Sequence, residues 1–186
     1  MLRRAVTMEL VGQRVILRRW RRGDEGALVH HADNRNVWRN MTDRFPYPYG
    51  ARDAEAWIAQ RTADVGRPTQ LAITLDGEPI GGIGFERQPE LGRLTAEIGY
   101  WLGESHWGRG LAPEALRLAT GYAFAEFDFV RLQAGVLDWN PRSRRVLEKV
   151  GYRFEGRLAK AVVKDGAVID RWLYARLRDD SPTFVG

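Results

Sequence analysis

The 186-residue sequence contains no cysteine, which excludes disulfides, thiolate metal sites and a cysteine nucleophile. Histidine is also scarce, since His30, His31 and His106 are the only three, and they lack the spacing of metal ligands. No segment approaches the roughly 20 apolar residues of a membrane span. The basic N-terminal residues are not followed by the apolar stretch of a secretory signal. We therefore expect a cytoplasmic protein with no metal and no membrane association.

The composition is otherwise ordinary for a globular protein, with 44% hydrophobic and 28% charged residues. A chain of this length is long enough for one domain with a core and too short for two comfortable ones. No repeat or linker divides it, so we expect one domain over residues 8–180, with tails at 1–7 and 181–186. The net charge of +5 suits a polyanionic ligand without identifying it.

Hydrophobic periodicity predicts an α/β (α+β) fold with a mixed sheet of about seven strands and about four helices. Asp24 is a candidate N-cap for the first helix. The pairs Asp76-Gly77 and Asp165-Gly166 indicate two hairpin turns. The expected strands are 15–20, 70–75, 79–86, 95–102, 131–137, 152–163 and 168–176, and the expected helices are 24–32, 51–63, 112–127 and 140–150.

The most informative segment runs from Glu97 to Ala115 and is expected to form a strand, a glycine turn and a helix. The start of a helix presents unpaired backbone N–H groups and the positive end of the helix dipole. Gly108 and Gly110 would allow a phosphate to approach this backbone closely, and Arg109 would add a charged contact. A Walker loop is excluded by Leu111-Ala112, and a dinucleotide fingerprint is excluded by a proline in place of its third glycine.

Ser105-His-Trp-Gly-Arg-Gly-Leu-Ala112 resembles motif A of the GNAT superfamily of acyl-CoA N-acetyltransferases. With Glu114-Ala115 it is most similar to the RimJ- and RimL-type branch, which acetylates the N-termini of ribosomal proteins. Three further blocks agree in order: residues 10–19, residues 97–102, and residues 138–152, which resemble motif B. The resemblance implies a single GNAT-like domain over residues 8–180, with a splay between the fourth and fifth strands and with acetyl-CoA as co-substrate.

The resemblance also implies which residues bind acetyl-CoA, with the pantetheine arm entering the splay. Asn140 would bond this arm, although Asn before Pro is equally a good helix cap. The cluster Arg142, Arg144 and Arg145 is either a solvated helix face or a contact for CoA phosphates. The expected cofactor-binding residues are Tyr100, Trp101, Leu102, Trp107, Gly108, Arg109, Gly110, Leu111, Ala112, Asn140, Ser143 and Arg145.

Two positions depart from the family pattern. Ser105 stands where motif A usually has Gln or Arg, so phosphate binding would depend on backbone N–H groups and Arg109. Leu147 stands where many relatives carry a tyrosine that is proposed to protonate the CoA thiolate. Ser143, Tyr152 or water remain as alternatives for this general acid, and Ser143 is the protein side chain that we expect near the thioester.

Glu97 is the best candidate for the general base, because the resemblance puts its strand beside the acetyl group; a carboxylate in an ordinary rim salt bridge is the alternative. His106 is more readily explained as a solvent-facing or cofactor-edge residue than as a catalyst. An aromatic group between the first two helices is either a satellite core or the acceptor-binding surface. This group consists of Trp38, Phe45, Tyr47 and Tyr49.

These observations predict an acetyl-CoA-dependent N-acetyltransferase that acts by direct transfer in a ternary complex. A protein or peptide α-amine is the favoured acceptor, because an amine of pKa near 8 is roughly 10% neutral at pH 7, against about 0.04% for lysine. The alternatives are a polyamine, aminoglycoside or amino-acid derivative as acceptor, or a non-catalytic RNA- or ribosome-binding module on the same fold. Nucleic acid is not expected as a substrate, and the sequence leaves monomer and homodimer open.

Overall fold

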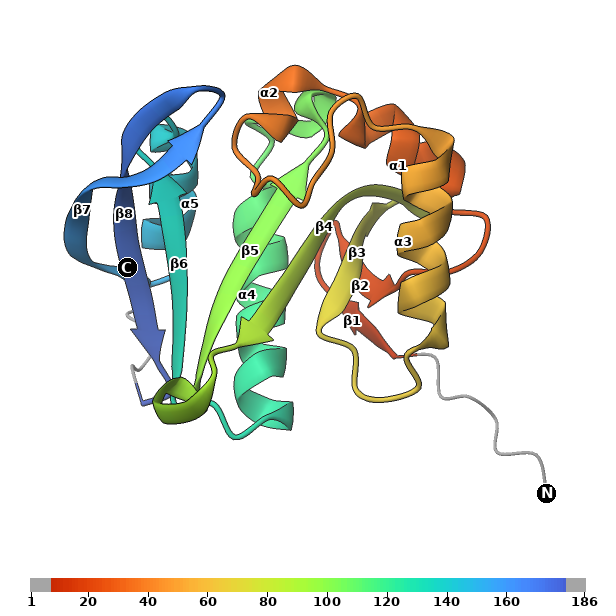
Figure 1. The fold of residues 1–186 in the computed structure, drawn as a ribbon. Coiled ribbons are helices and arrows are strands. Elements are labelled where there is room, and N and C mark those ends of the chain that lie inside the picture. The colour runs from red at the N-terminus through yellow and green to blue at the C-terminus, as the bar shows by residue number, and fades with distance from the viewer. Residues whose placement is uncertain (1–7, 180–186) are drawn as a thin grey trace.

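The computed structural model describes residues 8–179, so the expected tails at 1–7 and 181–186 lie outside the described residues (Figure 1). This part of the chain forms eight strands, five α-helices and two short 3-10 helices, η1 (Glu90–Gly92) and η2 (Glu104–His106). The strands are β1 (Glu9–Val11), β2 (Ile16–Arg19), β3 (Gln70–Leu75), β4 (Glu78–Arg87), β5 (Thr95–Leu102), β6 (Arg131–Leu137), β7 (Arg153–Lys164) and β8 (Ala167–Leu177). The helices are α1 (Glu25–Ala32), α2 (Arg35–Trp38), α3 (Ala51–Ala63), α4 (Leu111–Glu126) and α5 (Pro141–Lys149).

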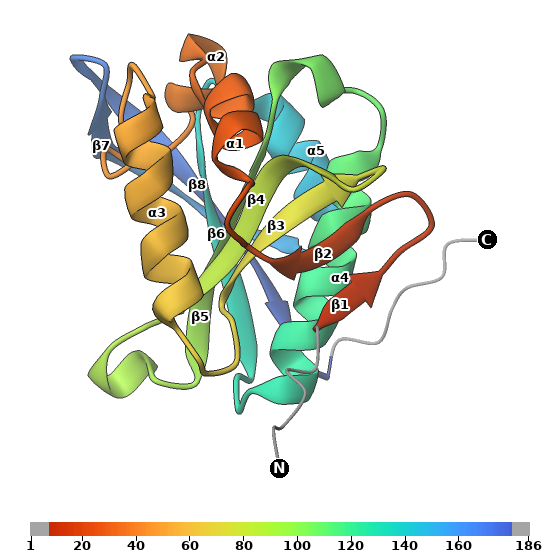
Figure 2. The same ribbon diagram turned by 90° about the vertical axis from the view of Figure 1, so that its right-hand side faces the viewer.

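The eight strands form one mixed sheet in the order β1-β2-β3-β4-β5-β6-β8-β7. The β5–β6 pair is parallel and joined through α4, and the other neighbouring strands in this order run antiparallel. The helices cover two faces of the sheet, with α1 and α3 on one and α4 on the other (Figure 2). The α/β class predicted from periodicity is confirmed.

Alternation along β5 separates the two faces. Ala96, Ile98 and Leu102 are buried in the core that also contains Ala115 and Leu116 of α4. Glu97, Gly99 and Trp101 point to the opposite face, because successive side chains of a strand alternate. A second core, under α1 and α3, is built around Trp20, Leu28, Tyr49 and Ile58.

The parallel pair β5–β6 is short. Its register runs only from Thr95 opposite Arg131 to Glu97 opposite Gln133, although β5 continues to Leu102 and β6 to Leu137. Past Glu97 the two strands diverge (Figure 1). These are the fourth and fifth strands of the predicted set, so the expected splay between them is confirmed.

The described residues contain one strand and one helix more than predicted. The additional strand is β1, which pairs antiparallel with β2 after a turn closed by the Gly12 N–H donating to the Val15 carbonyl at 2.9 Å. The additional helix is the single turn α2, whose N-cap Asn34 accepts from the N–H groups of Asn36 and Val37. Both elements are too short to show a full hydrophobic period, and periodicity therefore cannot detect them.

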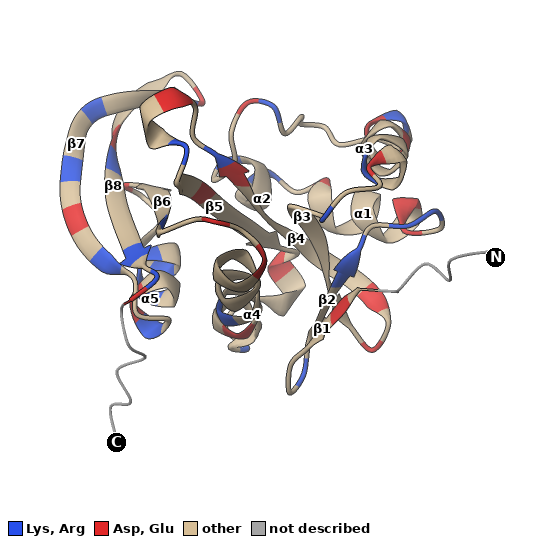
Figure 3. Cartoon of the chain, turned by 90° about the horizontal axis from the view of Figure 1, so that it is seen from below, with Lys and Arg blue, Asp and Glu red and all other residues tan. Residues whose placement is uncertain are grey.

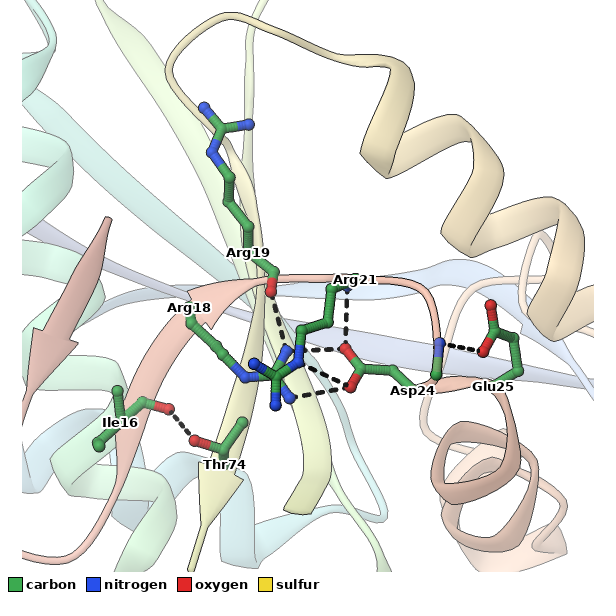
Figure 4. A network of polar contacts seen from close by, with 8 residues as sticks. Ile16, Arg18, Arg19, Arg21, Asp24, Glu25 and Thr74 are labelled. Atoms are coloured by element: carbon green, nitrogen blue, oxygen red, sulfur yellow. Dashed lines mark hydrogen bonds and ion pairs between the residues drawn. The ribbon is translucent and has the colours of Figure 1, made fainter. Parts of the chain in front are cut away.

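Asp24 precedes α1 as expected, but its carboxylate makes no capping bond to the helix. Instead, its two oxygens accept from Nη1 and Nη2 of Arg18 at 2.7 and 2.9 Å, and Oδ2 also accepts from the Arg21 N–H at 3.0 Å (Figure 4). The side chains of Arg18 and Asp24 are only 7% and 5% exposed. The pair therefore joins β2 to the start of α1 inside the protein, and the capping prediction is wrong.

We expect Asp24→Asn to lower the free energy of unfolding by about 3–5 kcal/mol, because it leaves the buried Arg18 charge without its partner. Urea denaturation of the variant would measure this loss. The control is Glu126→Gln, which breaks the exposed Arg67–Glu126 pair and should cost less than about 1 kcal/mol. Equal, small losses in both variants would contradict a structural role for the buried pair.

Candidate functional site

A continuous cleft begins at the splay and extends along the sheet. One wall comes from β5, with Tyr100 and Trp101, and the other comes from β6, with Ala134 and Val136. The loop before α4 and the first turn of α5 line the same cleft. The two segments that resemble motifs A and B are thus brought together at the point where β5 and β6 separate.

The glycine loop connects β5 to α4 through Gly103, η2 and Trp107. Gly108 and Gly110 both adopt a φ of +75°, in the left-handed region that glycine enters without strain. The Trp107 indole donates to the Leu102 carbonyl at 2.8 Å and so closes the base of the loop. The loop therefore delivers its backbone to the N-terminus of the 16-residue helix α4, as predicted.

Arg14, in the turn between β1 and β2, holds this loop from behind. Its guanidinium donates to the carbonyl oxygens of Arg109 and Gly110 at 2.7 and 3.0 Å. In a trans peptide the N–H points opposite to the C=O. The N–H groups of Gly110 and Leu111 are therefore directed away from Arg14, and both residues line the cleft.

Glu114, on the first turn of α4, holds Arg14 in place. Its carboxylate accepts from the backbone N–H groups of Arg14 and Val15 at 2.7 and 3.1 Å and from Nε of Arg14 at 3.2 Å. Burial by itself would raise the pKa of Glu114, but these hydrogen bonds outweigh it and hold the pKa below its usual value. Both residues lie in segments that resemble family blocks, but the sequence did not predict their contact, since they are 100 positions apart.

The start of α5 brings Asn140 and Ser143 to the cleft. The Asn140 Oδ1 accepts from the Ser143 N–H at 3.1 Å, so the helix-capping interpretation of Asn140 is confirmed. The Ser143 hydroxyl lies 2.9 Å from the Tyr100 hydroxyl, which also donates to the Ser143 carbonyl at 3.2 Å. Burial raises the pKa of Tyr100 well above its usual value, so this phenol is neutral near pH 7 and fixes Ser143 as a hydrogen-bond partner.

Of the side-chain alternatives for the general acid, only Ser143 lines the cleft. Tyr152 is 2% exposed and its hydroxyl lies 2.8 Å from Thr120 Oγ1, inside the core. Leu147 is fully buried in the same core. Neither position 147 nor position 152 therefore presents a tyrosine hydroxyl to the cleft.

Glu97 lies at the base of the splay, on the sheet face opposite α4, with its side chain 35% exposed. Arg171 of β8 reaches across β6 and donates to its carboxylate. This arginine passes over Gly135, where a side chain would overlap with its guanidinium. Sequence reasoning missed Arg171; the signal was the glycine inside a predicted strand, which often marks a close approach of another group.

The four aromatic residues suggested for acceptor binding divide into two pairs. Phe45 and Tyr49 line the cleft and belong to the second core, where Phe45 meets the Trp101 ring at a centroid distance of 5.5 Å. Trp38 and Tyr47 are not among the lining residues and pack against each other with centroids 5.6 Å apart. The aromatic segment therefore serves partly as core and partly as a wall of the cleft.

The tip of the β7–β8 hairpin is tied to the segment around α2. The Lys164 side chain is 4% exposed, and its Nζ lies 2.9 Å from Asp43 Oδ1 and 3.9 Å from the centroid of the Trp38 ring. The exposed pair Arg35–Asp165 adds a contact at 2.9 Å. Since the hairpin continues the β6 side of the sheet and residues 39–49 pack on the β5 side, these contacts bridge the two sides across the cleft.

The cleft gathers all but one of the residues predicted to bind acetyl-CoA. The exception is Arg109, whose guanidinium lies 3.2 Å from His106 Nδ1. The side chains of Leu102 and Leu111 are buried, so these residues would contact a ligand through their backbone groups. Arg145 lines the cleft from α5, on the part of the molecule where Lys and Arg gather over α5 and β7 (Figure 3).

Metal binding and membrane spanning can be judged for the described residues 8–179. Within this range no group of three or more His, Cys, Asp or Glu side chains is arranged to hold a metal ion. None of the helices in the described part of the chain is long and apolar enough to cross a membrane.

Comparisons with known proteins agree with this geometry. The model of the Acetyltransferase (GNAT) domain family matches residues 14–153. The chain is 44% identical over 86 residues to Probable N-acetyltransferase YjcK of Bacillus subtilis (strain 168), covering 46% of this chain and 48% of that protein. It is 36% identical over 114 residues to the Ribosomal-protein-serine acetyltransferase of Escherichia coli (strain K12), covering 61% of this chain and 63% of that protein. Both alignments therefore span less than two thirds of the relative's own length.

Among solved structures, Mycobacterium smegmatis RimJ in complex with CoA-disulfide is similar with a TM-score of 0.79 and 28% identity, covering 90% of this chain and 84% of that one. These relatives confirm the resemblance to the RimJ- and RimL-type branch. The family match extends from β2 to α5 and thus includes the glycine loop, β5, β6 and the Asn140–Ser143 turn. The chain belongs to the GNAT family of N-acetyltransferases.

Proposed function

We propose that this protein uses acetyl-CoA to acetylate a primary amine, with the N-terminal α-amine of a protein or peptide as the favoured acceptor. The observation that carries the proposal is the glycine loop at the start of α4, which opens beside the splay between β5 and β6. The loop suits a pyrophosphate, and the splay suits an extended arm with amide groups. The CoA-disulfide in the related RimJ structure supports the same donor.

Donor binding would depend on backbone more than on side chains. The N–H groups of Gly110 and Leu111 point away from Arg14, toward the cleft, where the helix dipole also favours an anion. Arg145 is positioned on the same cleft to meet a phosphate of CoA. Ser105, which replaces the usual Gln or Arg of motif A, does not line the cleft, consistent with backbone recognition.

Transfer would be direct, in a ternary complex. The neutral amine attacks the thioester carbonyl, the C–S bond breaks, and the amine proton passes to Glu97 directly or through water. Backbone N–H groups near Tyr100 or Trp101 stabilise the tetrahedral oxyanion. Ser143, held by the Tyr100 hydroxyl, relays a proton to the departing thiolate and takes one from water in return.

The acceptor assignment has two supports. An α-amine, with a reference pKa of roughly 8, loses its proton more readily near neutral pH than a lysine amine, whose reference pKa is roughly 10.4. The relative from Escherichia coli is named for acetylation of a ribosomal protein. The cytoplasmic location and the domain limits of 8–180 remain predictions from the sequence.

We expect Gly108→Leu to weaken CoA binding by at least about tenfold, or about 1.4 kcal/mol. A Cβ at Gly108 meets no atom within 4 Å, so the new side chain would occupy the space in front of the loop. Calorimetric titration with CoA measures the Kd. Gly77→Leu is the control, because Gly77 has a similar φ of +87° in the β3–β4 turn, and the two variants share the backbone strain. An unchanged Kd in folded Gly108→Leu would remove the loop from the donor site.

Two substitutions at Asn140 separate its capping role from cofactor binding. Asn140→Ala should lower stability by about 0.5–2 kcal/mol and raise the KM for acetyl-CoA, because it loses both the cap and the amide. Asn140→Asp keeps the capping oxygen and loses the amide donor, so stability should hold while the KM rises. Steady-state kinetics and thermal unfolding measure the two effects. Wild-type KM in Asn140→Asp would leave capping as the only role.

Glu97→Gln keeps the shape of the side chain and removes the base. We expect the rate at neutral pH to fall by about 10²–10⁴-fold. Raising the pH increases the neutral fraction of the amine, so a variant acting on an α-amine should recover by about pH 9, whereas a lysine-like amine requires pH above about 10. A pH–rate series on wild type and variant measures both.

Glu86→Gln is the matched control, since Glu86 lies directly opposite Glu97 on β4 and pairs with the exposed Arg44. An equal loss in Glu86→Gln would mean that the charge of this sheet face, rather than a base at Glu97, matters. A rate that continues to climb past about pH 10 would favour a polyamine or another small amine as the acceptor.

A further inference from the structure

Four glycines lie on one face of the sheet, beside the splay. Gly82 and Gly84 are on β4, where they stand opposite Trp101 and Gly99 of β5. Gly135 is on β6, two residues beyond Gln133, which stands opposite Glu97. Because opposed residues of paired strands share a face and alternate residues of one strand do too, all four point away from α4. Strand glycines of this kind mark places where another group approaches the backbone.

Neighbouring side chains already occupy the space above three of these glycines. A Cβ on Gly82 would lie 2.8 Å from Nε1 of Trp101. A Cβ on Gly84 would overlap with the side-chain amide of Gln70, and one on Gly135 would overlap with the guanidinium of Arg171. A Cβ on Gly99 would meet no atom within 4 Å. Gly99 is thus the open position in this set of four.

The exposure of Gly99 is unusual for its place in the fold. Gly99 is exposed although it lies in the middle of β5, one of the central strands of the sheet. It lines the cleft together with the three side chains that cover the other glycines, and with Glu97 two residues before it. The space above Gly99 is therefore surrounded by an amide, an indole, and a carboxylate held by a guanidinium.

We propose that this space receives the first residue of a peptide acceptor, and that Gly99 determines which acceptors are accepted. This inference rests on the proposed function. The Gln70 amide donates and accepts hydrogen bonds, as a peptide group requires. Glu97 provides an anionic partner for the terminal amine, and the Trp101 ring provides an apolar wall. A residue without a side chain at position 99 lets the peptide backbone approach the strand.

The arrangement favours a peptide over a polyamine for a chemical reason. A polyamine carries charged amines separated by methylene groups and has no peptide group to match the Gln70 amide. The guanidinium of Arg171 also stands beside the site, where a second cationic amine would be repelled. An α-amino terminus offers one cation followed by a neutral amide, which fits the order from Glu97 and Gly99 on β5, across β4, to Gln70 on β3.

The test is Gly99→Val, with Gly99→Ala as a smaller step. We expect kcat/KM for short peptides with a free N-terminus to fall by about 10–200-fold in the valine variant, the range for a changed fit of this size. The decrease for a small primary amine without a peptide group should be clearly smaller. The Kd for CoA should remain within about twofold of wild type, because the site faces away from α4 and the donor loop. Gly99→Ala should change the same parameters in the same direction, and it carries the test if the valine variant does not fold.

Gly156→Val and Gly156→Ala are the matched controls. Gly156 is a strand glycine in β7 whose added Cβ meets nothing within 4 Å, and it does not line the cleft. Unchanged kcat/KM for peptides in folded Gly99 variants, an equal decrease for peptides and small amines, or a parallel loss of CoA binding would each overturn the inference. If the wild-type protein releases no CoA from acetyl-CoA with any amine, the proposed function itself fails, which is a different result.

Discussion

The structure depends most on one constraint at the centre of its sheet: β5 and β6 pair over three residues and then separate. The short parallel contact at Thr95–Glu97 keeps the described strands in a single sheet. Past it, the facing edges of the two strands have backbone N–H and C=O groups without a partner in the opposite strand. Such groups require water or a ligand as partner. An opening of this kind therefore suits an extended ligand with amide groups of its own.

The same separation gives the cleft two chemically different sides. On the α4 and α5 side, the glycine loop, Asn140 and Ser143 present N–H and hydroxyl groups close to a helix N-terminus. On the opposite side, Glu97 lies beside an exposed glycine and the aromatic wall. A donor and an acceptor that enter from opposite sides would meet in the splay, which is the geometry that direct transfer requires.

Much of this arrangement could be predicted from the sequence. This holds where the conformation of a residue depends on its neighbours in the chain. The Asp76-Gly77 turn, the left-handed glycines at 108 and 110, and the Asn140 cap all depend on residues within a few positions. These local signals also determine the order of strands and helices and the start of α4. The resemblance in four ordered blocks then added the splay, which no local pattern predicts because it concerns two strands about 30 residues apart.

The sequence by itself therefore determined the fold class, the glycine loop and several residues on each wall of the cleft. Only the tertiary structure decided what the long charged side chains do. Arg14, held by Glu114, supports the loop carbonyls, Arg171 reaches Glu97 across β6, and Asp24 binds Arg18 instead of capping its helix. The physical reason is that an arginine reaches across a neighbouring strand, so its partner is set by sheet register and by burial, and partners 74 or 100 positions away leave no local pattern in the chain.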